Sequence, residues 1–309
     1  MKVDKILQSI RYSKPINACR SFFKTIRIPG LEGMSMYEVF KFTLEAFTRS
    51  DIATKSSAIS FKLFIALFPA VILLLSLIPY VPIDNFQADL LNSITSIMPH
   101  NVGKVINQTI EDLILKKHTG FLSVGFVLTI YYSSDIIHSI LTTFSNSYQI
   151  EIKRNPIKQR ILSFVLMIII TTMMIIGFAL ILFSESAISY VISTYIIEED
   201  FVATGMRILK WIAVVLLFMM SISTLYNTAL MDRKKWKIIS NGASYATILI
   251  IVVSMGMRYY IDNFDSYNKL YGSIGSLIVF LIWLNLSSTI LIMGFELYAK
   301  TNTKNHEND

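Results

Sequence analysis

Reactive and metal-binding side chains are scarce in this 309-residue chain. It has one cysteine, Cys19, so no disulfide can form within the chain. The four histidines lie far apart in the sequence, and no P-loop, GxSxG, HExxH or CxxC pattern occurs. We therefore predict no enzyme activity, no catalytic residues, no metal site and no cofactor. Nuclease chemistry in particular is disfavoured, because it commonly uses metals held by clustered histidines and carboxylates.

Charged residues are also few, and long apolar runs take their place. They make up 16% of the chain, whereas ordinary soluble domains have about 25%. Hydrophobic residues reach 53%. One run, ILSFVLMIIITTMMIIGFALILF, exceeds the roughly 20 residues that a helix needs to cross a bilayer. The composition excludes a soluble globular domain and predicts an all-α, polytopic membrane protein.

The apolar runs predict six transmembrane helices. We expect them at residues 56–80, 120–147, 161–189, 208–230, 239–260 and 274–299. Residues 1–55 then form a basic N-terminal segment, residues 56–299 the transmembrane domain, and residues 300–309 a tail. The N-terminal segment contains an amphipathic pattern made by Met36, Phe40, Leu44 and Phe47, which predicts a helix packed on the bundle through these residues.

Lysine and arginine lie mainly in alternate connecting segments. Twenty fall in the set formed by residues 1–55, the loops EIKRNPIKQR and DRKKWK, and the tail after Ala299, whereas four fall in the other set. Since cytoplasmic loops are enriched in these residues, both termini are predicted to be cytoplasmic. Topology therefore explains the net charge of +7, and no nucleic-acid partner is predicted. The basic loops are expected to contact anionic membrane lipids.

The predicted outer loop, residues 81–119, contains two amphipathic patterns within residues 84–117. Phe86, Leu90 and Ile94 are spaced as on one helix face, and a second pattern follows from Val102. These patterns predict helices on the outer side that lie on the membrane or cap the bundle. The same segment would offer a surface to an envelope protein partner.

Polar side chains within the predicted spans favour the cytoplasmic halves. Asp135, His138 and Thr142 follow one another at spacings of three and four, which places them on one helix face. Lys62 is predicted to pair with Asp135, because intramembrane charges usually pair or face a cavity. We hypothesise that these side chains face the bundle interior and line a substrate cavity open to the cytoplasm. The further cavity candidates are Thr224, Asn227, Asn285 and Glu296.

Each of these residues also has a structural interpretation. Lys62 could snorkel to the inner interface, and Glu296 is favoured to form an i,i+4 pair with Lys300. Serine and threonine often bond their own helix backbone or join helices, and His138 could serve only as an anchor. Pro69 is expected to kink the first span. A role in helix kinking or packing is also assigned to Gly272, Gly275 and Gly294.

Two long stretches resemble the signatures of the YihY/virulence factor BrkB family. They are TKSSAISFKLFIALFPAVILLL and LYGSIGSLIVFLIWLNLSSTILIMGFELYA, and together with WKIISNGASYATILIIV the resemblance spans most of residues 37–300. It implies a six-helix protein of the bacterial inner membrane. Labels within the family include ribonuclease BN, serum-resistance factor and transporter. The positions that carry over are Ala58, Ser60, Phe61, Leu67, Phe68, Pro69, Tyr271, Gly272, Gly275, Trp283, Gly294 and Glu296.

The chain departs from the family pattern at two of the cavity candidates. A neutral residue or tyrosine is usual at the position of Lys62, and tyrosine is usual at the position of Asn285. A Lys62–Asp135 pair would therefore be particular to this chain.

Two functions remain open at this point. The first is transport of a lipid, an amphiphile or a small solute through the polar cavity, as by a transporter or flippase. The alternative is a non-transporting scaffold for envelope assembly, in which the polar residues join helices. The sequence leaves open the substrate, the direction, the energy coupling and the oligomeric state.

Overall fold

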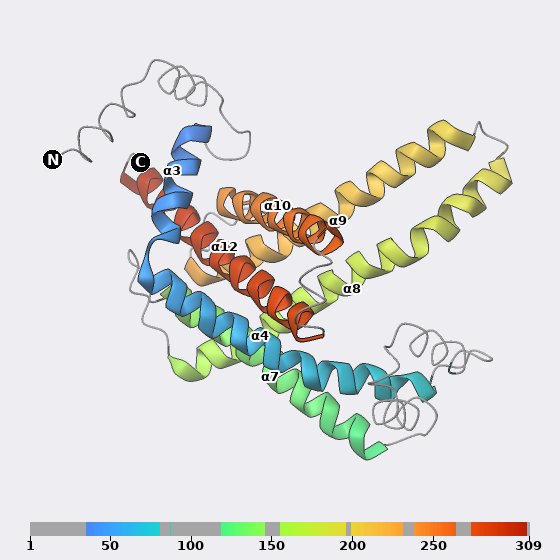
Figure 1. Cartoon of the computed structure of the whole chain (residues 1–309), viewed down its shortest axis with the longest axis horizontal. Helices are drawn as coiled ribbons and strands as arrows, with labels where there is room; N and C mark the ends of the chain where they lie inside the picture. The colour runs from blue at the N-terminus through green and yellow to red at the C-terminus, as the bar shows by residue number, and fades with distance from the viewer. Residues whose placement is uncertain are drawn as a thin grey trace.

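The structure, a computed structural model, describes residues 35–80, 87, 119–145, 155–195, 199–230, 238–263 and 273–307. These residues form helices and no strand. The long helices are α3 (Met36–Phe47), α4 (Ser50–Leu77), α7 (Thr119–Ser145), α8 (Pro156–Tyr195), α9 (Glu199–Leu230), α10 (Asn241–Asn263) and α12 (Ser273–Glu307), with a short 3-10 turn η1 (Ile78–Tyr80) (Figure 1). The amphipathic helices predicted in residues 84–117, apart from Gln87, lie outside the described residues, as does Gly272.

Six of these helices are long and apolar enough to cross a membrane. The spans are Ser50–Tyr80, Gly120–Ser145, Pro156–Ser184, Thr204–Leu230, Asn241–Asn263 and Gly275–Asn302. The prediction of an all-α membrane protein with six transmembrane helices is confirmed. The helices extend beyond several predicted spans, because hydropathy detects only the apolar part of a helix. α4, for example, begins six residues earlier than expected, in the polar stretch SDIATK.

The six membrane helices form a ring. Helices that follow one another in the chain pack side by side from α4 to α12, and α12 packs in turn against α4. α3 and the end of α12 lie at the same end of this bundle, which we call the α3 end (Figure 1). Away from it, α8 and α9 extend together beyond α10 and α12. The cytoplasmic location of the α3 end remains a prediction from charge.

The best-packed part of the core lies toward the α3 end, where α7, α9 and α12 meet. Phe144 stacks on Phe295 with ring centroids 4.0 Å apart, and Tyr226 lies edge-on to both rings. The Tyr226 hydroxyl donates a hydrogen bond to the Leu291 carbonyl oxygen at 2.7 Å. Burial of these aromatic rings fixes the three helices relative to one another.

α10 and α12 are in close backbone contact at two glycines. A Cβ atom on Gly242 would clash with the Gly294 carbonyl oxygen. A Cβ atom on Gly294 would lie 2.5 Å from the Tyr226 hydroxyl and 2.8 Å from the Gly242 carbonyl oxygen. Small residues allow such close backbone contact between membrane helices. Of the other positions assigned to kinking or packing, Pro69 is buried within the continuous helix α4, and Gly275 is buried in α12.

α3 packs on the bundle through a different face from the one predicted. Ser35 caps the helix in a capping box with Glu38. Val39, Phe42 and Ala46 pack against the core, whereas the side chains at the predicted contact positions Phe40, Leu44 and Phe47 are 62%, 52% and 44% exposed. α3 is apolar on two faces, so hydropathy alone could not decide which face meets the bundle.

Candidate functional site

A cluster of three charged side chains joins α4, α7 and α8 within the membrane spans. Asp135 on α7 accepts a hydrogen bond from Lys62 Nζ on α4 at 2.7 Å and one from Arg160 Nη1 on α8 at 3.0 Å. Each carboxylate oxygen therefore has its own cation. Lys62 lies twelve residues into α4, about 18 Å along the helix axis. The predicted contact between Lys62 and Asp135 is present, and the cluster carries one excess positive charge.

The charged cluster is partly open to its surroundings. The side chains of Lys62, Asp135 and Arg160 are 39%, 24% and 37% exposed. The Arg160 guanidinium lies over the ring of Tyr131, 5.3 Å from the ring centroid, and Tyr131 is itself exposed. Intramembrane charges are expected either to pair with one another or to face a polar path. These three charges are paired, and their side chains remain partly exposed.

Tyr131, Asp135, His138 and Thr142 form a polar stripe on α7, which lies on the face away from the apolar core. Ile137, Leu141 and Phe144 are buried in that core. At about 100° per residue, Asp135 and Thr142 lie on roughly the opposite side of the helix from Phe144. The sequence pattern predicted that these polar side chains face the bundle interior. They lie instead at the junction of α4, α7 and α8, because helical spacing groups residues on a face without showing what that face contacts.

Two further side chains extend the charged cluster along α7. The Thr142 hydroxyl accepts a hydrogen bond from Gln159 Nε2 on α8 at 2.8 Å and donates one to the His138 carbonyl oxygen at 2.8 Å. His138 Nδ1 is buried and has no hydrogen-bond partner among the described residues. An unpaired buried nitrogen of this kind commonly marks a place for a water molecule or a ligand.

Three of the remaining candidates take part in other contacts. Asn285 Nδ2 on α12 donates a hydrogen bond to the Ser57 hydroxyl on α4 at 3.2 Å. Asn227 Oδ1 on α9 accepts one from the Tyr298 hydroxyl on α12 at 2.5 Å. The Thr224 hydroxyl bonds to its own helix backbone. Asn285 and Asn227 therefore join pairs of helices, and Thr224 bonds within its own helix, as the structural interpretation of such side chains expects.

Glu296 forms an ion pair that was not predicted from the sequence. Its carboxylate is buried and accepts a hydrogen bond from Arg49 Nη1 at 2.7 Å, whereas Lys300 was the expected partner. The pKa of the Arg49 guanidinium is raised, chiefly by its hydrogen bond to Asp51 and also by the charge of Glu296. This pair ties the segment before α4 to the last turns of α12.

Arg49 and Arg160 are the site residues that sequence reasoning missed. Both lie outside the predicted spans, so both were counted only as flanking charges that set topology. Arg160 is one residue before the predicted span 161–189, and a long side chain at that position can extend to a partner on the neighbouring helix. The length of the Arg160 side chain was therefore the feature of the sequence that could have predicted its pairing with Asp135.

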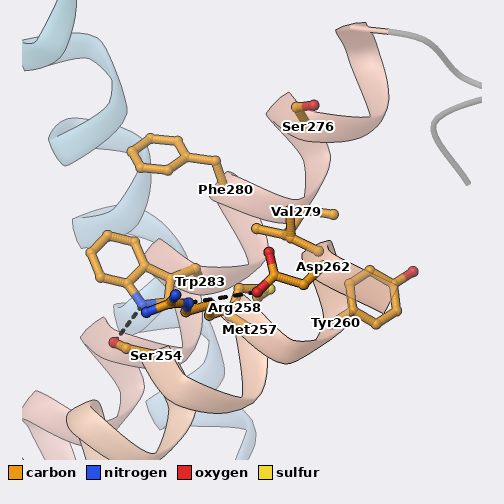
Figure 2. A pocket seen from close by; sticks show the side chains of 10 residues that line it. Ser254, Met257, Arg258, Tyr260, Asp262, Ser276, Val279, Phe280 and Trp283 are labelled. Carbon is orange, nitrogen blue, oxygen red and sulfur yellow. Dashed lines mark hydrogen bonds and ion pairs between the residues drawn. The ribbon is translucent and has the colours of Figure 1, made fainter. Parts of the chain in front are cut away.

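A separate cavity lies between α10 and α12, away from the α3 end. Its volume is about 450 Å³, and its walls include Met257, Phe280 and Trp283 (Figure 2). The cavity candidates named from the sequence do not line it. Among the described residues, no group of three or more His, Cys, Asp or Glu side chains could hold a metal ion.

Comparison with known proteins relates most of the chain to one family. The family model described as virulence factor BrkB matches residues 43–309. The ribonuclease-like protein YfkH of Bacillus subtilis is 26% identical over 261 residues, which cover 84% of this chain and 94% of that protein. A UPF0761 membrane protein of Histophilus somni is 26% identical over 266 residues, covering 84% of this chain and 88% of the relative.

A UPF0761 membrane protein of Vibrio campbellii is also similar. It is 22% identical over 276 residues, which cover 87% of this chain and 84% of the relative. No solved structure matches the chain.

Proposed function

This chain belongs to the virulence factor BrkB family, and on that premise we propose that it moves an amphiphile with an anionic headgroup across the bacterial cytoplasmic membrane. The observation that carries the proposal is the partly exposed cluster of Lys62, Asp135 and Arg160 inside the spans. A charged cluster at this depth is expensive to maintain if its only role is to join helices.

The charge of the cluster suits a phosphate headgroup. Two cations share one carboxylate, so a phosphate group can bind one of them, Arg160 or Lys62, while the other stays paired with Asp135. Arginine binds phosphate through paired hydrogen bonds, and lysine contributes a point charge. The buried, unpaired His138 Nδ1 lies on the same face of α7 and offers one more polar contact.

The length of the polar stripe suits passage of a headgroup along α7. From Tyr131 to Thr142 the stripe covers about 16 Å of the helix, roughly half of the 30 Å hydrocarbon core. A headgroup in contact with this stripe would avoid much of the cost of an unpaired charge in hydrocarbon. The acyl chains would stay in the surrounding lipid, so a closed cavity through the protein is not required.

Reconstitution into liposomes tests this function. The full chain is incorporated into vesicles with a trace of chain-labelled fluorescent phosphatidylglycerol, and an impermeant reductant removes the fluorescence of outer-leaflet label. With wild-type protein we expect the inner-leaflet label to become accessible as well. In Lys62→Gln/Arg160→Gln the rate should fall about tenfold, which corresponds to about 1.4 kcal/mol.

The matched control is Lys210→Gln on α9, whose ammonium group lies beside Trp211 and away from the cluster. It should keep the wild-type rate. Folded wild-type protein that leaves inner-leaflet label protected would refute transport of this lipid and favour the scaffold. A double variant as fast as wild type would show that the headgroup does not pass the cluster.

A further inference from the structure

The cavity between α10 and α12 has the size and lining of a site for an acyl chain. Its volume of about 450 Å³ falls within the range of about 300–1,000 Å³ that is common for small-molecule sites. Val279, Phe280 and Trp283 of α12 line it together with Met257 of α10 (Figure 2). Trp283 is fixed in place, because its Nε1 donates a hydrogen bond to the Ser254 hydroxyl at 3.0 Å.

Two opposite charges lie at one edge of this cavity. Arg258 and Asp262 are one turn apart on α10, with 3.5 Å between Nε and Oδ2, and their side chains are 85% and 61% exposed. Both belong to the cavity lining (Figure 2). An ion pair as exposed as this contributes little to stability, so both groups can take other partners at small cost.

The ion pair and the aromatic wall of this cavity lie at depths that match the headgroup and the acyl chains of a phospholipid. Asp262 is the penultimate residue of α10, and Arg258 lies one turn deeper. Trp283 is ten residues into α12 from the same end of the bundle, about 15 Å along the helix. The charges are therefore at headgroup level, while the aromatic wall reaches into the hydrocarbon layer.

We propose that this cavity binds one phospholipid whose headgroup carries both a phosphate and a primary ammonium group, as in phosphatidylethanolamine. The phosphate pairs with Arg258, the ammonium group donates hydrogen bonds to Asp262, and one acyl chain lies against Phe280 and Trp283. A purely anionic headgroup is repelled by Asp262. A choline headgroup has no N–H to donate. The site lies on other helices than the charged cluster and does not depend on transport.

Quenching of Trp283 fluorescence by lipids with brominated chains tests the site. The full chain with Trp211→Phe and Trp236→Phe keeps Trp283 as its single tryptophan. It is reconstituted in phosphatidylcholine vesicles that contain equal mole fractions of brominated phosphatidylethanolamine, phosphatidylglycerol or phosphatidylcholine in turn. We expect phosphatidylethanolamine to bind about two- to fivefold more strongly than the others, the factor that one exposed ion pair supplies.

Two variants assign the headgroup contacts. Asp262→Asn should abolish the preference for phosphatidylethanolamine over phosphatidylcholine, and Arg258→Gln should weaken binding of every phosphate headgroup. Glu45→Gln, at an exposed carboxylate on α3, is the control and should change neither. Equal quenching by the three lipids, or a preference that survives Asp262→Asn in folded protein, would refute the site. The quenching measurement does not depend on transport, so a protein that fails the transport assay should still show the preference for phosphatidylethanolamine.

Discussion

Asp135 is the residue on which the charged cluster depends, because it is the shared acceptor for two cations. Asp135→Ala leaves Lys62 and Arg160 close together with their shared counter-charge removed. Lys62→Gln is milder, since Asp135 keeps Arg160. For these half-exposed groups we expect Asp135→Ala to lower the free energy of unfolding by about 2 kcal/mol, between the values for exposed and buried pairs. Lys62→Gln should cost about 1 kcal/mol or less.

Reversible unfolding of both variants in mixed micelles would measure this difference. Lys210→Gln again serves as the control for loss of a lysine. Equal destabilisation by Asp135→Ala and Lys62→Gln would show that the cations do not repel one another once the carboxylate is removed.

At the level of single residues, two members of the charged cluster were predicted from the sequence and one was not. The scarcity of charge within the spans identified Lys62 and Asp135 as partners, since two isolated opposite charges in apolar helices have few alternatives. Arg160 was missed because it lies at the start of α8, where a cation is expected for topology alone. Its partner depends on the packing of α7 against α8, which the sequence pattern does not contain.

At the level of elements, the crossing of α10 and α12 depends on Gly242 and Gly294. Gly242→Ala places a methyl group against the Gly294 backbone and the Tyr298 side chain, so the two helices must move apart. Overpacking of this kind commonly costs about 1–3 kcal/mol. We expect a matching loss of thermal stability.

Gly256→Ala is the matched control for this prediction. It lies on the same helix, and a Cβ atom there meets nothing within 4 Å. Since alanine favours helix more than glycine, this variant should be neutral or slightly stabilising. Equal stability of the two variants would contradict the close crossing of α10 and α12.

Hydropathy predicted the helices well and their contact faces poorly. The six membrane helices are apparent because each needs about 20 apolar residues, a requirement that lipid imposes without reference to any neighbour. Contact faces are different, because side chains facing lipid are as apolar as those facing protein. The contact face of α3 was predicted wrongly for this reason.

For the whole molecule, the ring of helices places α3 and the last turns of α12 at the α3 end. Closure of the ring by α12 against α4 brings the first and last spans together, and the Arg49–Glu296 ion pair joins them. No periodicity in the sequence specifies that neighbour relation. The charge asymmetry between loops, by contrast, concerns the whole chain and predicts its orientation in the membrane.

Labelling with an impermeant maleimide tests that orientation. In a Cys19→Ser background, single cysteines replace Glu45 on α3 and Asn263 at the far end of α10, two exposed positions at opposite ends of the bundle. Twenty lysines and arginines lie in the segments assigned to the cytoplasm and four in the others. The opposite orientation, with the twenty on the outer side of the membrane, is therefore strongly disfavoured. We expect Asn263→Cys to react in intact bacterial spheroplasts and Glu45→Cys to react only after lysis. The reverse pattern would overturn the orientation, and labelling of both positions in intact cells would contradict their location on opposite sides of the membrane.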